Sequence, residues 1–448
     1  MLDPATAQDR ALALVERARR AGADAADAVY HGEASESVSV RLGKLEDVER
    51  SESEHASLRV FVGKASASIG SSDLSDGALD ELAERAVAMA RAAPDDAYAG
   101  LAPEDMLARG PWPELDLCDA AEPSAADLRD RAQEGEDAAR AVAGVTNSEG
   151  GGASAGRGVF ALATSHGFVG GYQSSSHGLS VSVVAGEGAG MQRDYAWRSA
   201  RHLADLPGAD EIGALAGERA VRRLAPGRLA SGTLPVVFDP RVGGSLVSHL
   251  LSAMSGSAIA RGASFLIGRE DQQLFDPAVA VLDEPHRLRG LRSRPFDGEG
   301  LATAPRALVE RGRLTGWLMD SAAARQLGGR PTGHAARGSG GAPGVSASNV
   351  HIAAGEVSPA ELIADIADGV YVTELIGQGV NGVTGDYSRG ASGYRIVKGE
   401  IAGPVAEFTV AGNLVDMFRA VAPANDLEWH RAVNVPTLRI DGLMIAGD

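Results

Sequence analysis

The 448-residue sequence predicts an α+β protein, with helices and a mixed sheet in the N-terminal half and a β-rich C-terminal half. One observation is that the hydrophobic period switches from helical to two after the first helix. The other is glycine, with 57 residues where a usual share of ~7% would give about 31. These glycines follow no repeat, which is typical of many turns between strands. We expect the C-terminal strands to form a twisted, largely antiparallel sheet or a barrel-like one.

Helix caps and apolar patterns locate the individual elements. Residues 3–22 predict the first helix, because Asp3-Pro4 forms its start and Gly22 follows its last turn. Ser124 and Asp127 resemble a capping box at the start of the third helix. The other elements are strands around 38–42, 58–62 and 65–69, helices over 75–93, 124–143 and 209–224, and hairpins within 150–190.

The chain divides most naturally at Pro226-Gly227. Residues 1–226 form an N-terminal α+β region, either as one unit or as two parts, 1–95 and 120–226. A stretch rich in proline between these parts predicts a linker or an irregular wrap. Residues 227–448 form the β-rich domain, with a strand at 234–238 and a helix near 358–367.

Composition excludes several classes of protein. A formal charge of −18 disfavours direct binding to nucleic acid, whose phosphates require clusters of basic residues. The single cysteine, Cys118, excludes a disulfide framework and a cysteine-based zinc module, and it fits a reducing compartment. The sequence contains no run of 18 apolar residues, so it predicts no membrane-spanning helix. The first ten residues lack the apolar core of a signal peptide. We expect a cytoplasmic protein without membrane contact.

Familiar catalytic motifs are absent or incomplete. The closest histidines, His166 and His177, are eleven residues apart, too far for a helical zinc site. The G-x-G-x-x-G at 377–382 is followed by turn residues and not by the helix that a dinucleotide site needs. The G-x-S-x-G at 152–156 lies in a glycine- and serine-rich stretch, and acidic neighbours disfavour a reactive thiolate at Cys118.

Two glycine-bounded segments remain as candidate ligand-binding loops. Residues 297–300 place Asp297 and Glu299 among glycines, and residues 385–390 contain Asp386, Tyr387, Ser388 and Arg389. Such loops present side chains or backbone to a ligand. The alternative is that both are tight turns with internally paired charges. The residues by themselves leave both interpretations open and give no complete catalytic set.

Three segments of the C-terminal half carry longer motifs: RPFDGEGLAT at 294–303, VNGVTGDYSRG at 380–390, and EFTVAGNLVDMF at 407–418, which contains Asn413. Together they resemble the TldD/PmbA family, and more closely its PmbA branch, also called TldE. The resemblance extends over nearly the whole chain, with weaker spacing in the N-terminal half.

The resemblance implies a cytoplasmic bacterial peptidase built as a heterodimer of a TldD-like and a PmbA-like chain. In the TldD branch, a helix with H-E-x-x-x-H and a cysteine near the C-terminus hold zinc, and the glutamate activates the zinc-bound water. Here the corresponding helix reads Gly244-Ser245 where that motif begins, and only His249 has a counterpart. Residues 434–444 contain no cysteine. Because catalytic zinc normally needs three protein ligands, we assign no catalytic or metal-binding residue.

The sequence is therefore interpreted as the metal-free subunit of a metallopeptidase that cleaves unfolded peptides or processes peptide precursors, with zinc in the TldD-like partner. Contacts with peptide or partner are expected at Asp297, Glu299, Asp386, Tyr387, Ser388, Arg389 and Asn413. One alternative is a non-enzymatic regulatory or peptide-binding protein. Another is a self-sufficient hydrolase that uses Asp297, Glu299 or Asp386 with a metal.

Overall fold

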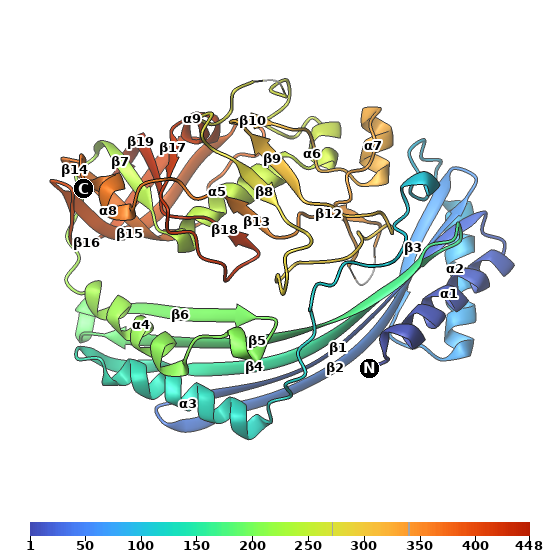
Figure 1. Ribbon diagram of the computed structural model, residues 1–448, viewed down its shortest axis with the longest axis horizontal. Helices are drawn as coiled ribbons and strands as arrows, with labels where there is room; N and C mark the ends of the chain where they lie inside the picture. The colour runs from blue at the N-terminus through green and yellow to red at the C-terminus, as the bar shows by residue number, and fades with distance from the viewer. Residues whose placement is uncertain (271, 339–340) are drawn as a thin grey trace.

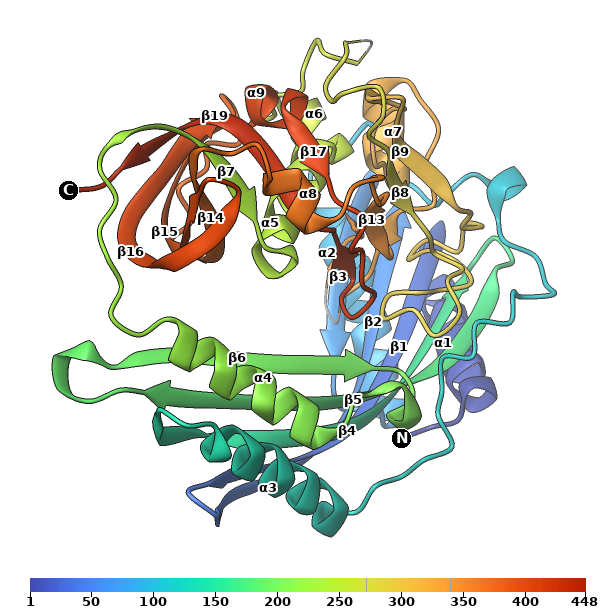
Figure 2. The same cartoon turned by 60° about the vertical axis from the view of Figure 1, so that its left-hand side comes forward.

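Two bodies make up the molecule: a curved sheet with helices on its outer face, and a β-rich body over its inner face (Figures 1 and 2). The computed structural model describes residues 1–270, 272–338 and 341–448. This arrangement confirms the predicted α+β class with a barrel-like C-terminal half. Within the described residues, no helix combines the length and apolar character needed to cross a membrane.

The N-terminal half contains one six-stranded sheet in the order β3-β2-β1-β4-β5-β6. Its strands are β1 (Ala25–Arg41), β2 (Lys44–Val62), β3 (Ala65–Ser71), β4 (Val145–Thr164), β5 (Val169–Ala185) and β6 (Gln192–Ala200). Every pairing is antiparallel, so the predicted mixed sheet is wrong in this detail. Short turns join the strands within each group of three, and such turns allow only antiparallel neighbours.

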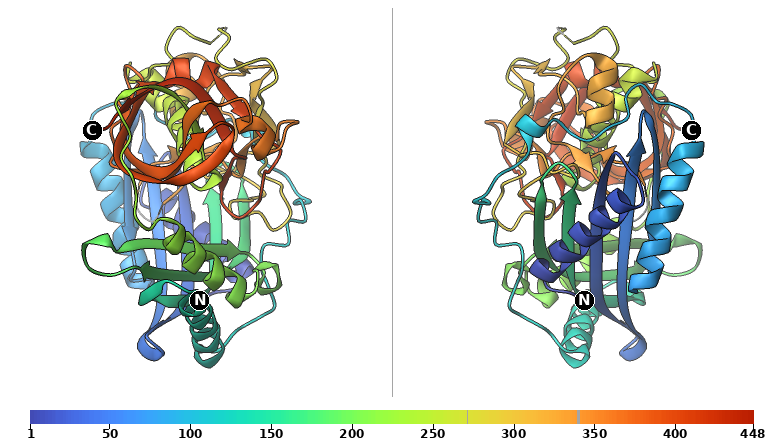
Figure 3. Two further views of the ribbon diagram at one scale, coloured as in Figure 1. Left: turned by 90° about the vertical axis from the view of Figure 1, so that its left-hand side faces the viewer. Right: turned by 90° about the vertical axis from the view of Figure 1, so that its right-hand side faces the viewer.

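Four helices cover the outer face of this sheet. They are α1 (Pro4–Arg20), α2 (Asp76–Ala92), α3 (Ala125–Ala141) and α4 (Ala209–Arg222). Asp3 caps α1 by accepting the backbone N–H of Ala5 at 3.0 Å, and Ser124 and Asp127 form the predicted capping box of α3. Apolar residues of α1 and α2 pack against β1, β2 and β4, and those of α3 and α4 pack against β1, β4, β5 and β6. Figure 3 shows α1 and α2 lying on the sheet.

The strands extend further than the sequence patterns predict. Leu42, expected on a strand, lies in the turn between β1 and β2 with φ of 51° and an exposed side chain. β2 begins at Lys44, and its first ten residues are exposed. Because neither face of β2 is buried over these ten residues, its sequence shows no apolar alternation there.

The proline-rich stretch runs between the two bodies without regular structure, apart from one 3₁₀ turn at Glu104–Met106. The backbone N–H of Ala108 donates to the Gly300 carbonyl at 2.8 Å, and Arg325 donates to the Tyr98 carbonyl at 2.8 Å. These long-range bonds attach the stretch to the C-terminal half.

A closed barrel forms the core of the C-terminal half, as the left view of Figure 3 shows. Its strands are β7 (Gly232–Phe238), β14 (Asp368–Ile376), β15 (Asp386–Val397), β16 (Glu400–Asn413) and β19 (Leu438–Ala446). The order is β16-β15-β14-β7-β19, and pairing of β16 with β19 closes the circle. Only β7 and β14 run parallel. β17 (Val421–Pro423) adds to β19.

A smaller sheet and short helices complete this half. The sheet contains β10 (Arg313–Leu314), β9 (Arg306–Glu310), β8 (Val281–Asp283), β13 (Val350–Ile352) and β18 (Val433–Asn434), and a separate pair joins β11 (Ala335–Ala336) to β12 (Gly344–Val345). The helices are α5 (Pro240–Ala253), α6 (Gly256–Ala260), α7 (Ser321–Leu327), α8 (Pro359–Ile363) and α9 (Leu414–Arg419). α8 ends four residues before the predicted limit of 367.

Buried charges join the two halves at one end of the sheet. Asp27 of β1 accepts hydrogen bonds from Arg59 at 2.8 Å and from Arg337 at 2.7 Å, and only 1% of Asp27 is exposed. Arg59 also reaches Glu299 at 3.4 Å. Burial raises the pKa of Asp27, but Arg337 and Arg59 together lower it below its usual value. Asp27 is therefore ionised and paired with two arginines, of which Arg59 lies on the neighbouring strand β2 and Arg337 belongs to the C-terminal half.

We expect Asp27→Asn to lower the free energy of unfolding by about 3–5 kcal/mol at pH 7, because it removes the carboxylate paired with buried Arg337 and leaves Arg59 with the more distant Glu299. This contribution is full above the unfolded pKa near 3.8 and is lost as the pH falls through the lower folded value. The difference between wild type and variant should therefore close in acid. Urea unfolding from pH 7 downward measures both effects.

Asp368→Asn is the matched control. Asp368 accepts two hydrogen bonds from Arg395, at 2.9 and 3.0 Å, but this pair lies at the surface. Its loss should cost about 0–1 kcal/mol. Equal losses in the two variants would contradict the role assigned to the buried pair.

Candidate functional site

The parallel pairing of β7 with β14 positions α5 beside the inner face of the large sheet. β7 ends at Phe238, and Asp239 then caps α5 by accepting the backbone N–H of Arg241 at 2.9 Å. Tyr371 of β14 donates its hydroxyl to Asp239 at 3.1 Å. This cap fixes the direction of the helix that carries Gly244, Ser245 and His249.

Three polar side chains with unpartnered atoms meet near α5. The rings of His249 and Tyr387 lie 6.3 Å apart and nearly perpendicular. His249 Nε2, the Tyr387 hydroxyl and Arg389 Nε are buried and have no hydrogen-bond partner in the described part of the chain. Arg389 donates once, from Nη2 to the Leu375 carbonyl at 3.4 Å. Buried polar atoms without partners are costly, and they are typical of sites that await a ligand.

Electrostatics keep this group neutral apart from its arginine. Burial, assisted by the Arg389 charge, lowers the pKa of His249 below its usual value, so the imidazole is uncharged at pH 7. Burial raises the pKa of Tyr387 to about 12, although Arg389 opposes the rise. The group therefore offers neutral hydrogen-bonding atoms beside one cation.

A cavity of about 240 Å³ lies beside these residues, and we term it the α5 cavity. It lies between β6, α5, β14 and β15. Its polar lining consists of Arg193, Asp194, Tyr195, Arg223, Arg241, Ser245, Thr373, Glu374 and Arg389. Asp194 is buried and accepts from Arg241 at 2.7 Å and from Arg223 at 3.4 Å. Burial raises the pKa of Asp194, but these contacts, led by Arg241, lower it below its usual value.

The four residues predicted as contacts on the 385–390 segment are divided by the structure between opposite faces of β15. Tyr387 and Arg389 face α5, whereas Asp386 and Ser388 are exposed. Asp386 accepts from Thr384 at 2.6 Å and from Asn413 at 3.2 Å. Asn413 in turn caps α9 by accepting the Val415 N–H at 3.1 Å. These contacts hold the turn and the cap together.

Gly244 and Ser245 occupy the first half of α5. The Ser245 hydroxyl donates to the Val242 carbonyl at 2.7 Å within the helix, although the residue lines the α5 cavity. A Cβ atom at Gly244 would lie 3.5 Å from the backbone carbonyl oxygen of Val433. The structure thus brings Ser245, His249 and the inward pair of β15 into one region.

Asp297 and Glu299 lie in the junction between the halves. Asp297 accepts three backbone N–H groups at 2.9, 2.9 and 3.1 Å, from Glu299, Leu301 and Ala335. Burial, followed by the neighbouring Glu299 charge, raises the pKa of Asp297 to about 7. Glu299 accepts the Ser321 N–H at 2.8 Å. Their oxygens are engaged by the protein itself.

The donor set does not fit a zinc ion. Within the described ranges, no three His, Cys, Asp or Glu side chains lie close enough to share a metal. His249 is the one histidine among the three inward-facing residues at α5, and its neighbours there are a phenol and a guanidinium. Three nitrogen, sulfur or carboxylate ligands are normally needed, and a guanidinium is not a ligand. Asp297, Glu299 and Asp386 do not meet at this place either.

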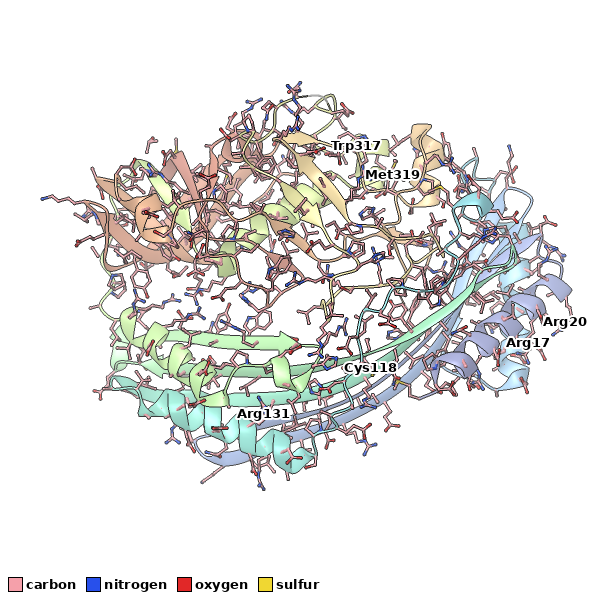
Figure 4. All side chains as sticks on the ribbon, in the orientation of Figure 1. Arg17, Arg20, Cys118, Arg131, Trp317 and Met319 are labelled. Atoms are coloured by element: carbon pink, nitrogen blue, oxygen red, sulfur yellow. The ribbon has the colours of Figure 1, made fainter. Side chains whose placement is uncertain are left out.

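Cys118 does not line the α5 cavity. It lies on the segment that crosses from the proline-rich wrap to α3 (Figure 4). Its thiol approaches the Asp119 carbonyl at 3.8 Å, and burial raises its pKa. The raised pKa agrees with the expectation that Cys118 is not a reactive thiolate.

Sequence reasoning missed the charged wall of the α5 cavity. Asp194, Arg223, Arg241 and Glu374 come from four elements and meet only in the fold. One available signal was the position of Asp194, a carboxylate on an inward-facing position of β6. Isolated charges in such positions are rarely buried without a partner.

Family models match three consecutive segments of the chain. The PmbA/TldA metallopeptidase domain 1 matches residues 26–90, the central domain matches 118–224, and the C-terminal domain matches 231–447.

Curated relatives extend this match over most of the chain. Metalloprotease PmbA of Escherichia coli is 37% identical over 413 residues, which are 92% of this chain and 90% of that protein. The Metalloprotease PmbA homolog of Haemophilus influenzae is 35% identical over 438 residues, with 97% and 94% covered.

Solved structures agree with the fold. A Bacteroides thetaiotaomicron protein, described as a candidate modulator of DNA gyrase, superposes with a TM-score of 0.91 at 26% identity, covering 98% of this chain and 99% of the other. TldE from Thermococcus kodakarensis gives 0.85 at 21% identity, with 98% and 100% covered, and this likeness shows the fold alone.

A curved sheet joined to a barrel-containing body is thus the fold of proteins related to metallopeptidases. The chain belongs to the PmbA/TldD family, as the resemblance of its motifs predicts. Its relatives carry protease names, so it is a member of a protease family.

We expect the ring of His249 to titrate below its ordinary pKa of 6.5, and we expect Arg389→Gln to raise that pKa. The substitution removes a neighbouring positive charge that disfavours protonation, whereas burial continues to oppose it. NMR of the histidine ring as a function of pH measures the midpoint. Arg395→Gln, on an exposed position of the same strand, should leave it unchanged. A midpoint insensitive to Arg389→Gln would contradict the coupling.

Proposed function

We propose that this chain is the zinc-free subunit of a two-chain cytoplasmic metallopeptidase, which cleaves unfolded peptides or processes peptide precursors. The observation that carries the proposal is the composition of α5. The resemblance makes this helix the counterpart of a metal-binding helix, yet it supplies one histidine and no carboxylate. The zinc would belong to a TldD-like partner that carries H-E-x-x-x-H and a cysteine.

The edge of the large sheet supports a role in holding peptide. β6 is the last strand of that sheet and pairs only with β5 among the described strands. Its Arg193–Tyr195 stretch borders the α5 cavity. Extended peptides commonly bind by adding a strand to such an edge, which supplies backbone hydrogen bonds without regard to sequence. Unpartnered atoms at α5 would then meet the side chains of that peptide.

A regulatory protein without enzymatic function is the rival, and the description of the Bacteroides structure favours considering it. The charge of −18 disfavours direct contact with DNA. A regulator of this kind would bind peptide or protein and would leave peptides uncut when mixed with a TldD-like chain. The two proposals therefore differ in a measurable product.

The isolated chain should purify without stoichiometric zinc, because its histidines and carboxylates do not converge at α5. Elemental analysis after purification without chelator measures the content. His249→Ala is the informative variant, because His249 is the residue of this helix that matches a zinc ligand of the H-E-x-x-x-H motif. About one zinc per chain that is lost in this variant would contradict the proposal.

Peptidase activity should appear only when the chain is mixed with a zinc-binding relative encoded in the same genome. Cleavage of an unstructured peptide, followed by mass spectrometry, measures the product for each chain alone and for the mixture. A partner variant with the H-E-x-x-x-H glutamate replaced by Gln should abolish cleavage but not association, because it removes only the general base. Cleavage by this chain alone at the rate of the mixture would overturn the proposal.

A further inference from the structure

A second cavity, of about 350 Å³, lies where the end of β6 meets two segments of the C-terminal half. Residues 198–201, 287–291 and 428–431 border it, and we term it the arginine cavity. Its basic lining consists of Arg198, Arg201, Arg287, Arg289 and Arg431. Its carboxylates are Asp205 and Glu428. This local excess of cations reverses the balance of a chain with 42 basic and 60 acidic residues.

Two of these arginines lack a counter-ion. Within residues 1–270, 272–338 and 341–448, no carboxylate pairs with Arg201 or Arg431. Arg201 donates to the Ser175 carbonyl at 2.8 Å, and Arg431 donates to the Arg241 carbonyl at 2.7 Å. Arg431 Nε is buried without a partner. Burial lowers the pKa of both side chains. A half-buried charge compensated only by carbonyls is stabilised when an anion enters.

The remaining arginines differ in how far the protein neutralises them. Arg289 pairs with Asp116 at 2.6 Å and with Asp205 at 3.1 Å, so its charge is used within the chain. Among the described carboxylates, Arg198 approaches Glu428 at 4.0 Å, and Arg287 approaches Glu284 at 3.7 Å. Free positive charge is therefore concentrated on the side of the cavity formed by β6 and residues 428–431.

Aromatic rings hold two guanidinium groups by their faces. The Arg287 guanidinium lies 3.4 Å from the centre of the Trp429 ring, and that of Arg431 lies 5.0 Å from the centre of Trp197. Stacking of this kind fixes the plane of the guanidinium and leaves its edge N–H groups available. A carboxylate is the planar acceptor that matches two such N–H groups.

The arginine cavity and the α5 cavity lie along the same strand. One borders β6 at Arg193–Tyr195 and the other at 198–201, about five residues further on. At about 3.3 Å per residue, an extended peptide beside β6 would span this distance with a similar number of residues. Arg431 also links the two places directly, through its bond to the Arg241 carbonyl.

We propose that the arginine cavity binds a carboxylate of the peptide held along β6, about five residues from the part that faces the α5 cavity. The inference rests on the proposed function, because it assumes a peptide at this edge. It makes acidic peptides, or peptides ending near this cavity, the preferred class. The carboxylate is that of an Asp or Glu side chain or that of a free C-terminus.

Binding of short, fluorescently labelled, unstructured peptides to the full-length chain tests the proposal. Three peptides differ only in their carboxylates: one has a central Gln and an amidated C-terminus, one has Glu in place of that Gln and an amidated C-terminus, and one has the central Gln and a free C-terminus. Fluorescence anisotropy at about 0.15 M salt limits non-specific attraction. We expect at least one acidic peptide to bind about 10- to 100-fold more tightly than the neutral one.

Variants locate that preference. Arg431→Gln and, separately, the more exposed Arg287→Gln should lower the ratio of the affinity for the carboxylate-bearing peptide to that for the neutral one. Arg395→Gln is the control. Arg395 is exposed on β15 and does not line the cavity, so its loss removes the same charge but should leave the preference for the carboxylate unchanged. Preference for the Glu peptide alone, or for the free C-terminus alone, supports the proposal and identifies the source of the carboxylate. Equal affinity for all three peptides overturns the carboxylate site and leaves the proposed function standing. Failure of every peptide to bind, with or without the partner, overturns both.

Discussion

Buried arginine–carboxylate pairs hold the C-terminal half over the inner face of the sheet, and the pairs of Asp194 form part of the wall of the α5 cavity. Asp27 binds arginines at one end of the sheet, and Asp194 binds Arg223 and Arg241 near β6. Desolvation cancels much of the attraction in such pairs, so they add little net stability compared with apolar packing. Their geometry is nevertheless demanding, because an offset leaves charges buried and unpaired. They therefore specify one orientation of the two bodies.

Local signals predicted the helices well and the sheet less well. Asp3 and the pair Ser124 and Asp127 mark helix starts because each satisfies backbone N–H groups within a few residues. Strand direction depends on partners far away in sequence, so the mixed sheet expected from local patterns is antiparallel instead. The exposed first part of β2 shows no apolar alternation, because a strand with both faces in solvent does not need apolar residues at every second position.

The candidate site was only half visible for a related reason. The segment 385–390 is one motif in sequence, but the period of a strand divides it between two faces. Tyr387 and Arg389 lie toward His249, whereas Asp386 bonds to Thr384 in the turn and Ser388 is exposed. His249 was identified through the family resemblance, because the whole helix could be matched to the one that carries H-E-x-x-x-H. The charged wall that includes Asp194 left no contiguous pattern, since Asp194 and Arg241 are 47 residues apart.

Arginine itself is not the informative feature of the arginine cavity. Only three of the 42 basic residues are lysines, Lys44, Lys64 and Lys398, so almost every positive charge in this chain is an arginine. What distinguishes the cavity is how its arginines are compensated. Arg289 has two carboxylates, whereas Arg431 has one backbone carbonyl and an aromatic ring. In a chain with a surplus of acids, an arginine is left without a counter-ion only where the fold holds the carboxylates away from it. That separation is a structural property, and no count of residues reveals it.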